Sequence, residues 1–122
     1  MMQESENKHV YDLEERTFQF AKAVRLFIRK IPRTIANIED AKQLVKSSGS
    51  TGAKYIEANE SLSPKDFLMR VKISRKEVKE SAYWLRLIHE TNEFDSDDEI
   101  VWINKEAGEL LKIFSAIINN HK

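Results

Sequence analysis

Residues 47–60 read SSGSTGAKYIEANE and place two glycines inside a segment whose other residues predict a long amphipathic helix. Glycine in a helix interior costs roughly 1 kcal/mol relative to alanine, so Gly49 and Gly52 need a compensating role in packing. A residue without a side chain lets a neighbouring backbone approach closely. The stretch therefore predicts a helix that packs tightly against another helix.

Apolar residues recur every three or four positions in this segment and in three others, which predicts four helices with one buried face each. The expected helices cover residues 11–31, 34–60, 63–88 and 96 onward, with a connection at 89–95. Short connections favour antiparallel packing of successive helices. We therefore expect an all-α fold, an antiparallel up-down-up-down four-helix bundle of left-handed twist. It forms a single domain over residues 11–120, and residues 1–10 are expected to be disordered or frayed.

The helix ends have recognisable signals. Pro32 ends the first helix, because a proline disfavours helical geometry in the residue before it. Thr34, Ser63 and Ser96 are the expected N-caps, and Pro64 follows Ser63 at the first helical position. The expected core-facing residues, helix by helix, are Leu13, Phe20, Val24, Phe27 and Ile31; Ile38, Ala41, Val45, Ser48, Gly52, Tyr55 and Asn59; Phe67, Val71, Ser74, Val78, Ser81, Leu85 and Ile88; and Ile100, Ile103, Ala107, Leu110, Leu111, Phe114, Ile117 and Ile118. Gly108 lies beside the last of these faces, and we expect another close contact there.

The composition excludes several classes of protein. The chain has 122 residues, of which 41% are hydrophobic and 33% are charged, so it should fold around a core. It has no cysteine, which removes disulfides and thiolate chemistry and fits a reducing compartment. The N-terminal residues lack the apolar region of a signal peptide, and no apolar run approaches the roughly 20 residues of a membrane span. We expect a soluble cytoplasmic protein with no membrane partner.

The formal net charge of zero conceals an uneven distribution. Residues 16–86 carry sixteen Lys and Arg against seven Asp and Glu, a net charge of +9. Residues 1–15 have a net charge of −4 and residues 87–122 one of −5. Polyanion binding depends on the local field rather than on total charge, so the basic middle is the strongest functional signal in the composition.

Catalytic and metal-binding patterns are lacking. The carboxylate pairs Glu57/Glu60 and Glu77/Glu80 have the helical i, i+3 spacing, but no histidine completes either one as in carboxylate-bridged metal bundles. The segment 49–54 fails as a phosphate loop because an alanine precedes Lys54 and no strand precedes the segment. No nucleophile, base and orienting group can be assembled. We expect no enzyme activity, no cofactor and no metal.

Basic residues follow one line of the third predicted helix. Lys65, Lys72, Lys79 and Arg86 repeat every seven positions, on the side away from the core. Lys76 and the aromatic Tyr83 border this line, while Arg25 and Arg29 (with Lys22 and Lys30) form a second basic group in the first helix. Cations with an interleaved aromatic are the ingredients of a surface for RNA, because phosphates meet the cations and a base stacks on the ring. The alternative interpretation is a solvated helix face with Glu–Lys pairs.

Two tryptophans allow different interpretations. Trp84 flanks the apolar face of the third helix and is most simply part of the core. Trp102 falls opposite the core-facing stripe of the fourth helix, and an outward tryptophan is typical of a protein contact. Self-association through Trp102 is the simplest form of that contact.

The runs SSGSTGAKYIEANE and SPKDFLMRVKISRKEVKESAYWLRLI together resemble a known family. It is the four-helix-bundle family first met as open reading frames in intervening sequences of bacterial 23S rRNA genes, and the resemblance covers about residues 11–118. It implies a closed antiparallel bundle that assembles into a homopentamer. The accessory variability protein of diversity-generating retroelements, which binds nucleic acid and a reverse transcriptase, is a distant relative of the same shape. The family defines no catalytic motif that could be carried over.

Two functions remain open at this stage. The first is a non-enzymatic oligomeric protein that binds RNA or DNA through the basic outer face of the third helix. The second is a homo-oligomeric scaffold for protein interactions, in which the basic middle pairs with an acidic surface of a partner or of a neighbouring subunit. The acidic start of the fourth helix departs from a uniformly basic surface and argues against an all-round RNA coat.

Overall fold

The computed structural model describes the backbone of residues 2–121 and the side chains of residues 13–121. Within that range the chain forms four helices joined by short connections, and it has no strand. They are α1 (Met2–Ile28), α2 (Ile35–Asn59), α3 (Pro64–Thr91) and α4 (Asp98–Asn120). The prediction that residues 1–10 are disordered or frayed stays a prediction, because their side chains lie outside the described residues.

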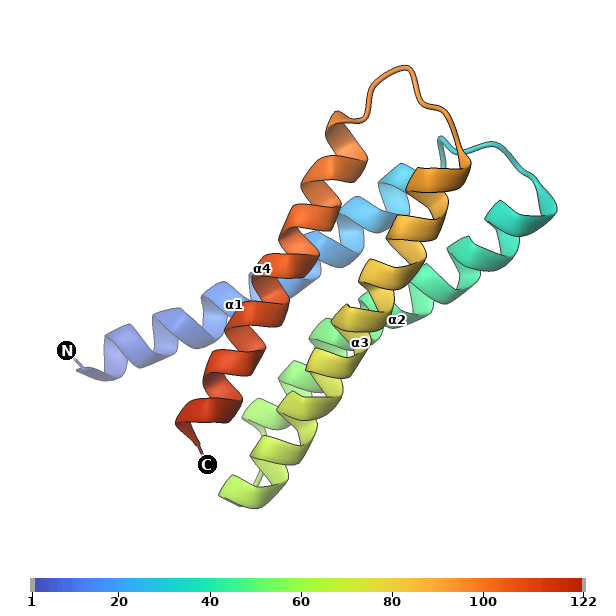
Figure 1. Ribbon diagram of the computed structural model, residues 1–122. Coiled ribbons are helices and arrows are strands. Elements are labelled where there is room, and N and C mark those ends of the chain that lie inside the picture. Colours follow the sequence, from blue (N-terminus) through green and yellow to red (C-terminus); the bar gives the residue numbers. More distant parts are fainter. Residues whose placement is uncertain (1, 122) are drawn as a thin grey trace.

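Each helix runs antiparallel to the next along the chain, as Figure 1 shows. Contacts join α1 to α2, α2 to α3, α3 to α4 and α4 back to α1, so the helices occupy the corners of a square in chain order. The most extensive interface is between α2 and α3, and the smallest is between α1 and α4. The predicted all-α four-helix bundle is confirmed, and its left-handed twist stays a prediction.

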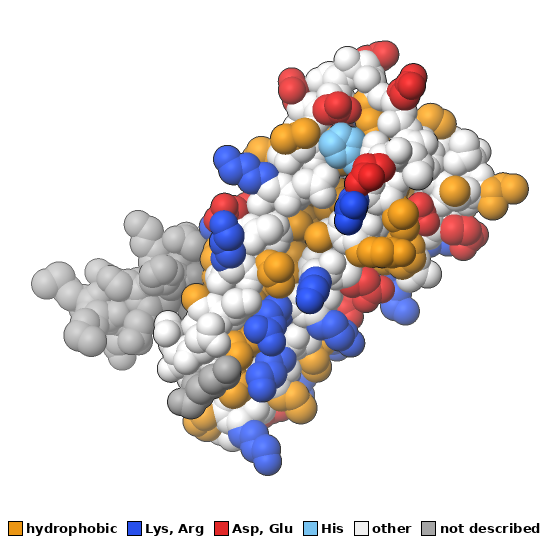
Figure 2. Space-filling view, in the orientation of Figure 1, with side chains coloured by type: hydrophobic (Ala, Val, Ile, Leu, Met, Phe, Trp, Pro, Cys, Tyr) orange, Lys and Arg blue, Asp and Glu red, His pale blue; other side chains and the backbone are white. Residues whose placement is uncertain are grey.

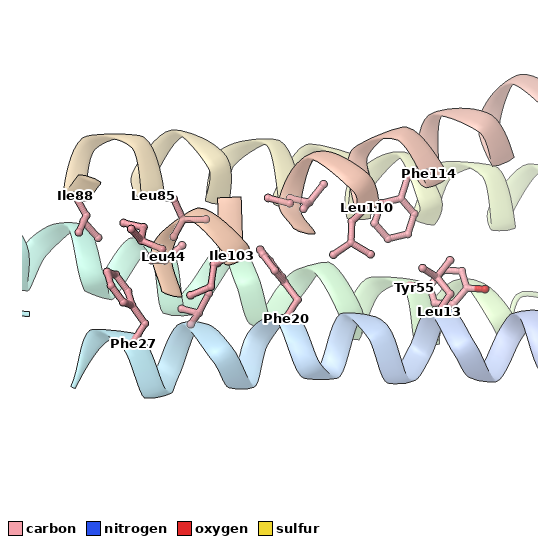
Figure 3. Packing of buried hydrophobic residues seen from close by; sticks show 14 of the residues in the cluster. Leu13, Phe20, Phe27, Leu44, Tyr55, Leu85, Ile88, Ile103, Leu110 and Phe114 are labelled. Carbon is pink, nitrogen blue, oxygen red and sulfur yellow. The ribbon is translucent and has the colours of Figure 1, made fainter. Parts of the chain in front are cut away.

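The core runs along the whole bundle and draws on all four helices. Figure 3 shows Phe20, Leu44, Leu85, Ile103 and Leu110 pointing into the space between the helices, and all five are fully buried. The faces predicted for the first, third and fourth helices are confirmed, with Phe67, Leu111 and Ile117 only partly buried at their margins. Thr17 and Glu106 are buried as well, although neither was predicted to face the core.

The face predicted for α2 is confirmed at Ser48, Gly52 and Tyr55 and is wrong in the first half of the helix, which is rotated from the predicted orientation. Ile38 is 37% exposed, whereas Asn37 and Leu44 are buried in its place. The rotation brings hydroxyls into the interface with α3, where Ser47 and Ser81 are hydrogen-bonded at 2.7 Å. The hydroxyls of Ser47, Ser48 and Thr51 on α2 can be buried because each is hydrogen-bonded, whereas Ser74 Oγ on α3 is buried without a partner among the described residues. The buried residues of α2 are Asn37, Leu44, Ser47, Ser48, Thr51, Gly52, Tyr55 and Ala58.

The helix ends agree with the sequence at two positions and differ at two. Thr34 Oγ1 accepts from the Asn37 N–H, and Ser63 Oγ accepts from the Asp66 N–H, both at 3.1 Å, so these N-caps are confirmed. Ser96 is not the N-cap of α4: that position belongs to Asp97, although the hydroxyl of Ser96 accepts from the Asp98 N–H at 3.3 Å.

The first helix ends at Ile28 rather than at residue 31. A tight turn follows, in which the Lys30 N–H donates to the Phe27 carbonyl at 3.0 Å. Ile31 is still buried, because the turn directs the chain back across the end of the bundle before Pro32. Ile31, the residue before Pro32, is non-helical as a proline requires, because the helix has already ended three residues before it.

The close approach predicted at the glycines of α2 is confirmed at Gly52. A Cβ atom there would lie 2.8 Å from Thr17 Oγ1 and 3.1 Å from Thr17 Cβ, closer than packed atoms normally come. Gly49 faces a side chain instead, since its Cβ would lie 3.1 Å from a terminal nitrogen of Arg25. The close contact predicted at Gly108 is wrong, because within the described part of the chain nothing lies within 4 Å of a Cβ built there.

We predict opposite effects for alanine at the two contrasting glycines. Gly52→Ala should lower the free energy of unfolding by about 1–3 kcal/mol, because α1 must move away from α2 to relieve the overlap with Thr17. Gly108→Ala should raise it by about 0.5–1 kcal/mol, because helix propensity improves and no atom is displaced. Urea unfolding at one fixed protein concentration measures both variants. A Gly52→Ala protein as stable as the wild type would contradict the close packing of α1 on α2.

Candidate nucleic-acid interface

The basic line predicted for the third helix lies on the exposed side of α3. This helix turns Val71, Val78 and Leu85 into the core, which leaves Lys65, Lys72 and the rest of the line on the outside. Figure 2 shows Lys and Arg side chains gathered along the face over α3 and α4. The exposed residues predicted to bind nucleic acid from this helix are Lys65, Lys72, Lys76, Lys79, Tyr83 and Arg86.

The cations of this line differ in whether a carboxylate already pairs with them. Among the described residues, Lys65, Lys72 and Lys79 form no salt bridge. Lys76 has a carboxylate neighbour at the long end of ion-pair distances, since its Nζ lies 4.0 Å from Glu77 Oε1. The three unpaired lysines are therefore the charges most available to a polyanion.

Arg86 at the end of the line already has a partner. Its Nε donates to Glu90 Oε2 at 2.6 Å, one helical turn further along α3. The hydrogen bond and charge of Arg86 hold the pKa of the Glu90 carboxyl below its ordinary value. The pair is therefore fully ionised at neutral pH, and Glu90 competes with any phosphate for the guanidinium group.

Tyr83 is the exposed aromatic residue of this surface. Its side chain is 58% exposed, and its ring meets Trp84 edge to face with the ring centroids 5.0 Å apart. Trp84 is half-buried against the core, as predicted, and its indole Nε1 is 3.5 Å from Glu80 Oε1. The half-buried Trp84 thus packs against the outward ring of Tyr83, on which a base would stack.

Arg25 and Arg29 do not join this surface. Arg25 lies in the last turn of α1 and Arg29 in the turn that follows it, and α1 lies diagonally across the bundle from α3. Both residues line a groove between α1 and α2 together with Arg33. Arg33 was not predicted as a site residue, yet the interval of four that separates it from Arg29, and Arg29 from Arg25, was a usable signal.

Trp102 is half-exposed on α4, as predicted, with 50% of its surface accessible. Val101 beside it is 51% exposed, so two adjacent apolar side chains face outward at the start of this helix. A protein contact through these residues stays a prediction.

The carboxylate pairs rejected as metal ligands take part in ion pairing or lie on the surface. Glu57 Oε2 accepts from Arg70 Nη1 at 2.8 Å, a bond between α2 and α3. No group of three His, Cys, Asp or Glu residues suited to a metal ion occurs among the described residues. In the same range, no helix has the length and apolar character needed to cross a membrane.

The fold and this surface define a small all-α four-helix-bundle protein with a basic outer face. The family model of the 23S rRNA-intervening sequence protein matches residues 10–116, and the chain therefore belongs to that family. A similar solved structure is the crystal structure of a protein of unknown function from the S23 ribosomal protein family of Bacteroides thetaiotaomicron VPI-5482. The two chains are 26% identical with a TM-score of 0.75, over 87% of this chain and 97% of the other. No curated protein matches the chain.

We predict that charge reversal on the basic line leaves the fold intact. Lys72→Glu with Lys79→Glu should change the free energy of unfolding by less than about 0.5 kcal/mol, because both side chains are exposed and neither has an ion-pair partner among the described residues. Chemical unfolding of the double variant measures this. A loss of several kcal/mol would show that the line stabilises the bundle and is not free for a ligand.

Proposed function

We propose that this protein is a non-enzymatic, oligomeric RNA-binding protein whose basic line on α3 contacts the phosphate backbone. The observation that carries the proposal is the set of exposed lysines at seven-residue intervals, Lys65, Lys72 and Lys79, without carboxylate partners among the described residues. Membership of a family encoded in 23S rRNA intervening sequences supports RNA over DNA as the ligand. DNA binding is the control in the experiments below.

The spacing of the line suits an extended polyanion. Seven residues of helix rise roughly 10 Å, so the line from Lys65 to Arg86 extends over about 30 Å. Each cation along that length can replace a counterion of the nucleic acid, and counterion release drives binding. Tyr83 lies between Lys79 and Arg86 in sequence and supplies a ring on which an unpaired base stacks. The chemistry favours single-stranded or looped RNA, whose bases are accessible.

An oligomer would strengthen a weak single surface. The resemblance to a homopentameric family implies several copies of the basic line on one particle. Linked sites bind one RNA with an effective concentration that raises the overall affinity well above that of each site. Three to five cations per subunit are then enough for firm binding at moderate salt.

We predict steeply salt-dependent binding to a structured RNA that contains single-stranded loops. The logarithm of the binding constant should fall linearly with the logarithm of salt, by about 0.7–0.9 for each phosphate neutralised. Lys72→Glu with Lys79→Glu should weaken binding at least a hundredfold at low salt, because two attractions become two repulsions. Fluorescence anisotropy measures the affinity, with a DNA duplex of matched length as the comparison.

The mass of the assembly at each salt concentration is the control for that titration. A stable oligomer that loses RNA with salt supports the proposal, and unchanged RNA binding by the double variant would contradict the assignment of the α3 face. No RNA binding at low salt, together with an assembly that persists as salt rises but dissociates in a Trp102→Ala variant, would support the second candidate, the interaction scaffold. The exposed pair of Val101 and Trp102 on α4 is the observation that favours that candidate.

We predict that removing the carboxylate beside Arg86 strengthens RNA binding. Glu90→Gln eliminates the acceptor that holds the Arg86 guanidinium at 2.6 Å and removes one negative charge from the surface. The RNA affinity should rise about threefold to tenfold, with a steeper salt dependence because one more cation is available. Glu93→Gln is the matched control, because it removes the same charge from an exposed residue outside the described ion pairs. Equal effects of the two variants would indicate overall charge rather than release of Arg86.

A further inference from the structure

A groove of about 810 Å³ lies between α1 and α2 at the end of the bundle where the first connection runs. This volume is within the range of ordinary small-molecule sites. Its floor is apolar and its rim is basic, and the lining includes no acidic side chain. The groove is lined by residues of α1, α2 and the connection between them, whereas the basic line lies on the outer face of α3, so the two share no residue.

Three arginines and one lysine supply the charge of the groove. Lys42 has a partner, since its Nζ is 3.4 Å from Glu39 Oε1. Arg25, Arg29 and Arg33 form no salt bridge with the described residues. Three guanidinium groups without a carboxylate, in a recess without acids, create a strong positive potential.

Arg25 is held in place by the backbone. Its Nη1 donates to the Ala21 carbonyl at 3.1 Å, and its Nη2 reaches the Val45 carbonyl of α2 at 3.5 Å. The missing side chain of Gly49 leaves room for this guanidinium, since a Cβ there would lie 3.1 Å from Nη2. Gly49, for which the sequence predicts a close backbone contact, thus makes room for the Arg25 guanidinium instead.

The floor of the groove explains the error in the predicted face of α2. Ile38, Ala41 and Val45 were assigned to the core from their spacing, but they line the groove together with Ile28. Ile38 remains 37% exposed there, and the other three are half-buried. An apolar surface at helical spacing is therefore left open beneath a rim of guanidinium groups.

We propose that this groove binds a nucleoside 5′-phosphate, free or as the phosphorylated end of an RNA. The phosphate meets Arg29 and Arg33, and the base lies against the apolar floor. The choice of ligand class rests on the proposed RNA function. Arginine suits this task because its planar group donates two parallel hydrogen bonds to phosphate and stacks on aromatic rings.

The contrast with α3 supports this assignment. The α3 line consists mainly of lysines on a convex helix face. Each lysine ammonium is a compact point charge, so the line suits a nucleic-acid backbone that carries many phosphates. The groove concentrates arginines around a concave apolar floor, which suits one phosphate joined to one flat apolar body. An acidic peptide or a second copy of the chain are the alternative occupants, and the experiment distinguishes them.

The test uses the full-length protein labelled at Ile and Val methyl groups and titrated with adenosine 5′-monophosphate. The methyl signals of Ile28, Ile38 and Val45 should shift in a saturable manner, whereas Val101 on α4 should not. Arg29→Gln with Arg33→Gln should weaken binding at least tenfold, and the matched control Lys105→Gln with Lys112→Gln, which removes two exposed cations of α4, should leave it unchanged. Adenosine and inorganic phosphate, each alone, should bind at least tenfold more weakly than the nucleotide. The mass of each variant assembly is recorded.

The outcomes separate this proposal from the proposed function. Nucleotide binding that survives the arginine changes, or phosphate that binds as tightly as the nucleotide, would overturn the groove assignment. So would an assembly that dissociates in the arginine variant, because the groove would then hold a second copy. RNA binding lost in Lys72→Glu with Lys79→Glu would still support the α3 surface in either event.

A hexaribonucleotide with and without a 5′-phosphate, titrated into the Lys72→Glu with Lys79→Glu variant so that the α3 line does not contribute, then separates the two sources of the ligand. Tighter binding of the phosphorylated RNA than of the mononucleotide supports the groove as a site for RNA ends. Weaker binding supports it as a site for free nucleotide. Equal binding of the phosphorylated and unphosphorylated RNA would overturn the role of Arg29 and Arg33 as phosphate ligands.

Discussion

The contact between Gly52 of α2 and Thr17 of α1 sets how close these two helices come, and the geometry of the bundle depends on it. A Cβ at Gly52 would lie 2.8 Å from Thr17 Oγ1, so only glycine allows the observed separation. On its other side α2 meets α3 through the hydrogen-bonded hydroxyls of Ser47 and Ser81, 2.7 Å apart. Small residues on both sides let α2 approach two neighbours at once, and bulky residues from all four helices, Leu44 and Tyr55 of α2 among them, fill the remaining core.

This packing separates the positive charge of the chain into two surfaces of different chemistry. The burial of Val71, Val78 and Leu85 directs the lysines of α3 outward, where they form an open line. The rotation of α2 instead leaves apolar side chains beside Arg25 of α1 and Arg29 and Arg33 of the connection after it, and creates a recess. An open line of point charges suits a flexible polyanion, whereas a recess with an apolar floor suits a single compact ligand. Both surfaces carry cations without carboxylate partners among the described residues, and the two proposals therefore share one ligand chemistry, that of phosphate groups.

Much of the fold was predictable because its signals are local. Thr34 and Ser63 cap their helices by accepting hydrogen bonds from backbone N–H groups three positions further along the chain. Such caps can be predicted from the sequence because both partners lie within one turn. The faces of α1, α3 and α4 carry large apolar residues at helical spacing, so their burial followed directly. On α2 the same rule failed in the first half of the helix, because Ile38 and Val45 signal a core by hydrophobicity, while the helix buries Leu44 together with several small or polar residues instead. The close contact predicted at Gly108 was wrong for a related reason: the position of a glycine along a helix does not reveal whether another helix packs against it.

The sequence by itself determined the helices, most of their buried faces and the outward line of lysines on α3, because each depends on periodicity within one helix. The tertiary structure decided which helices are neighbours, and through that it decided the groove. Arg25, Arg29 and Arg33 come from α1 and the connection after it, and their apolar floor comes largely from α2. The arginines and the apolar floor come together only because of how α2 is rotated about its own axis. That rotation is set by the hydroxyl pairing with α3 and by the close packing at Gly52. No pattern within one helix carries that information, because rotation is fixed by contacts between helices.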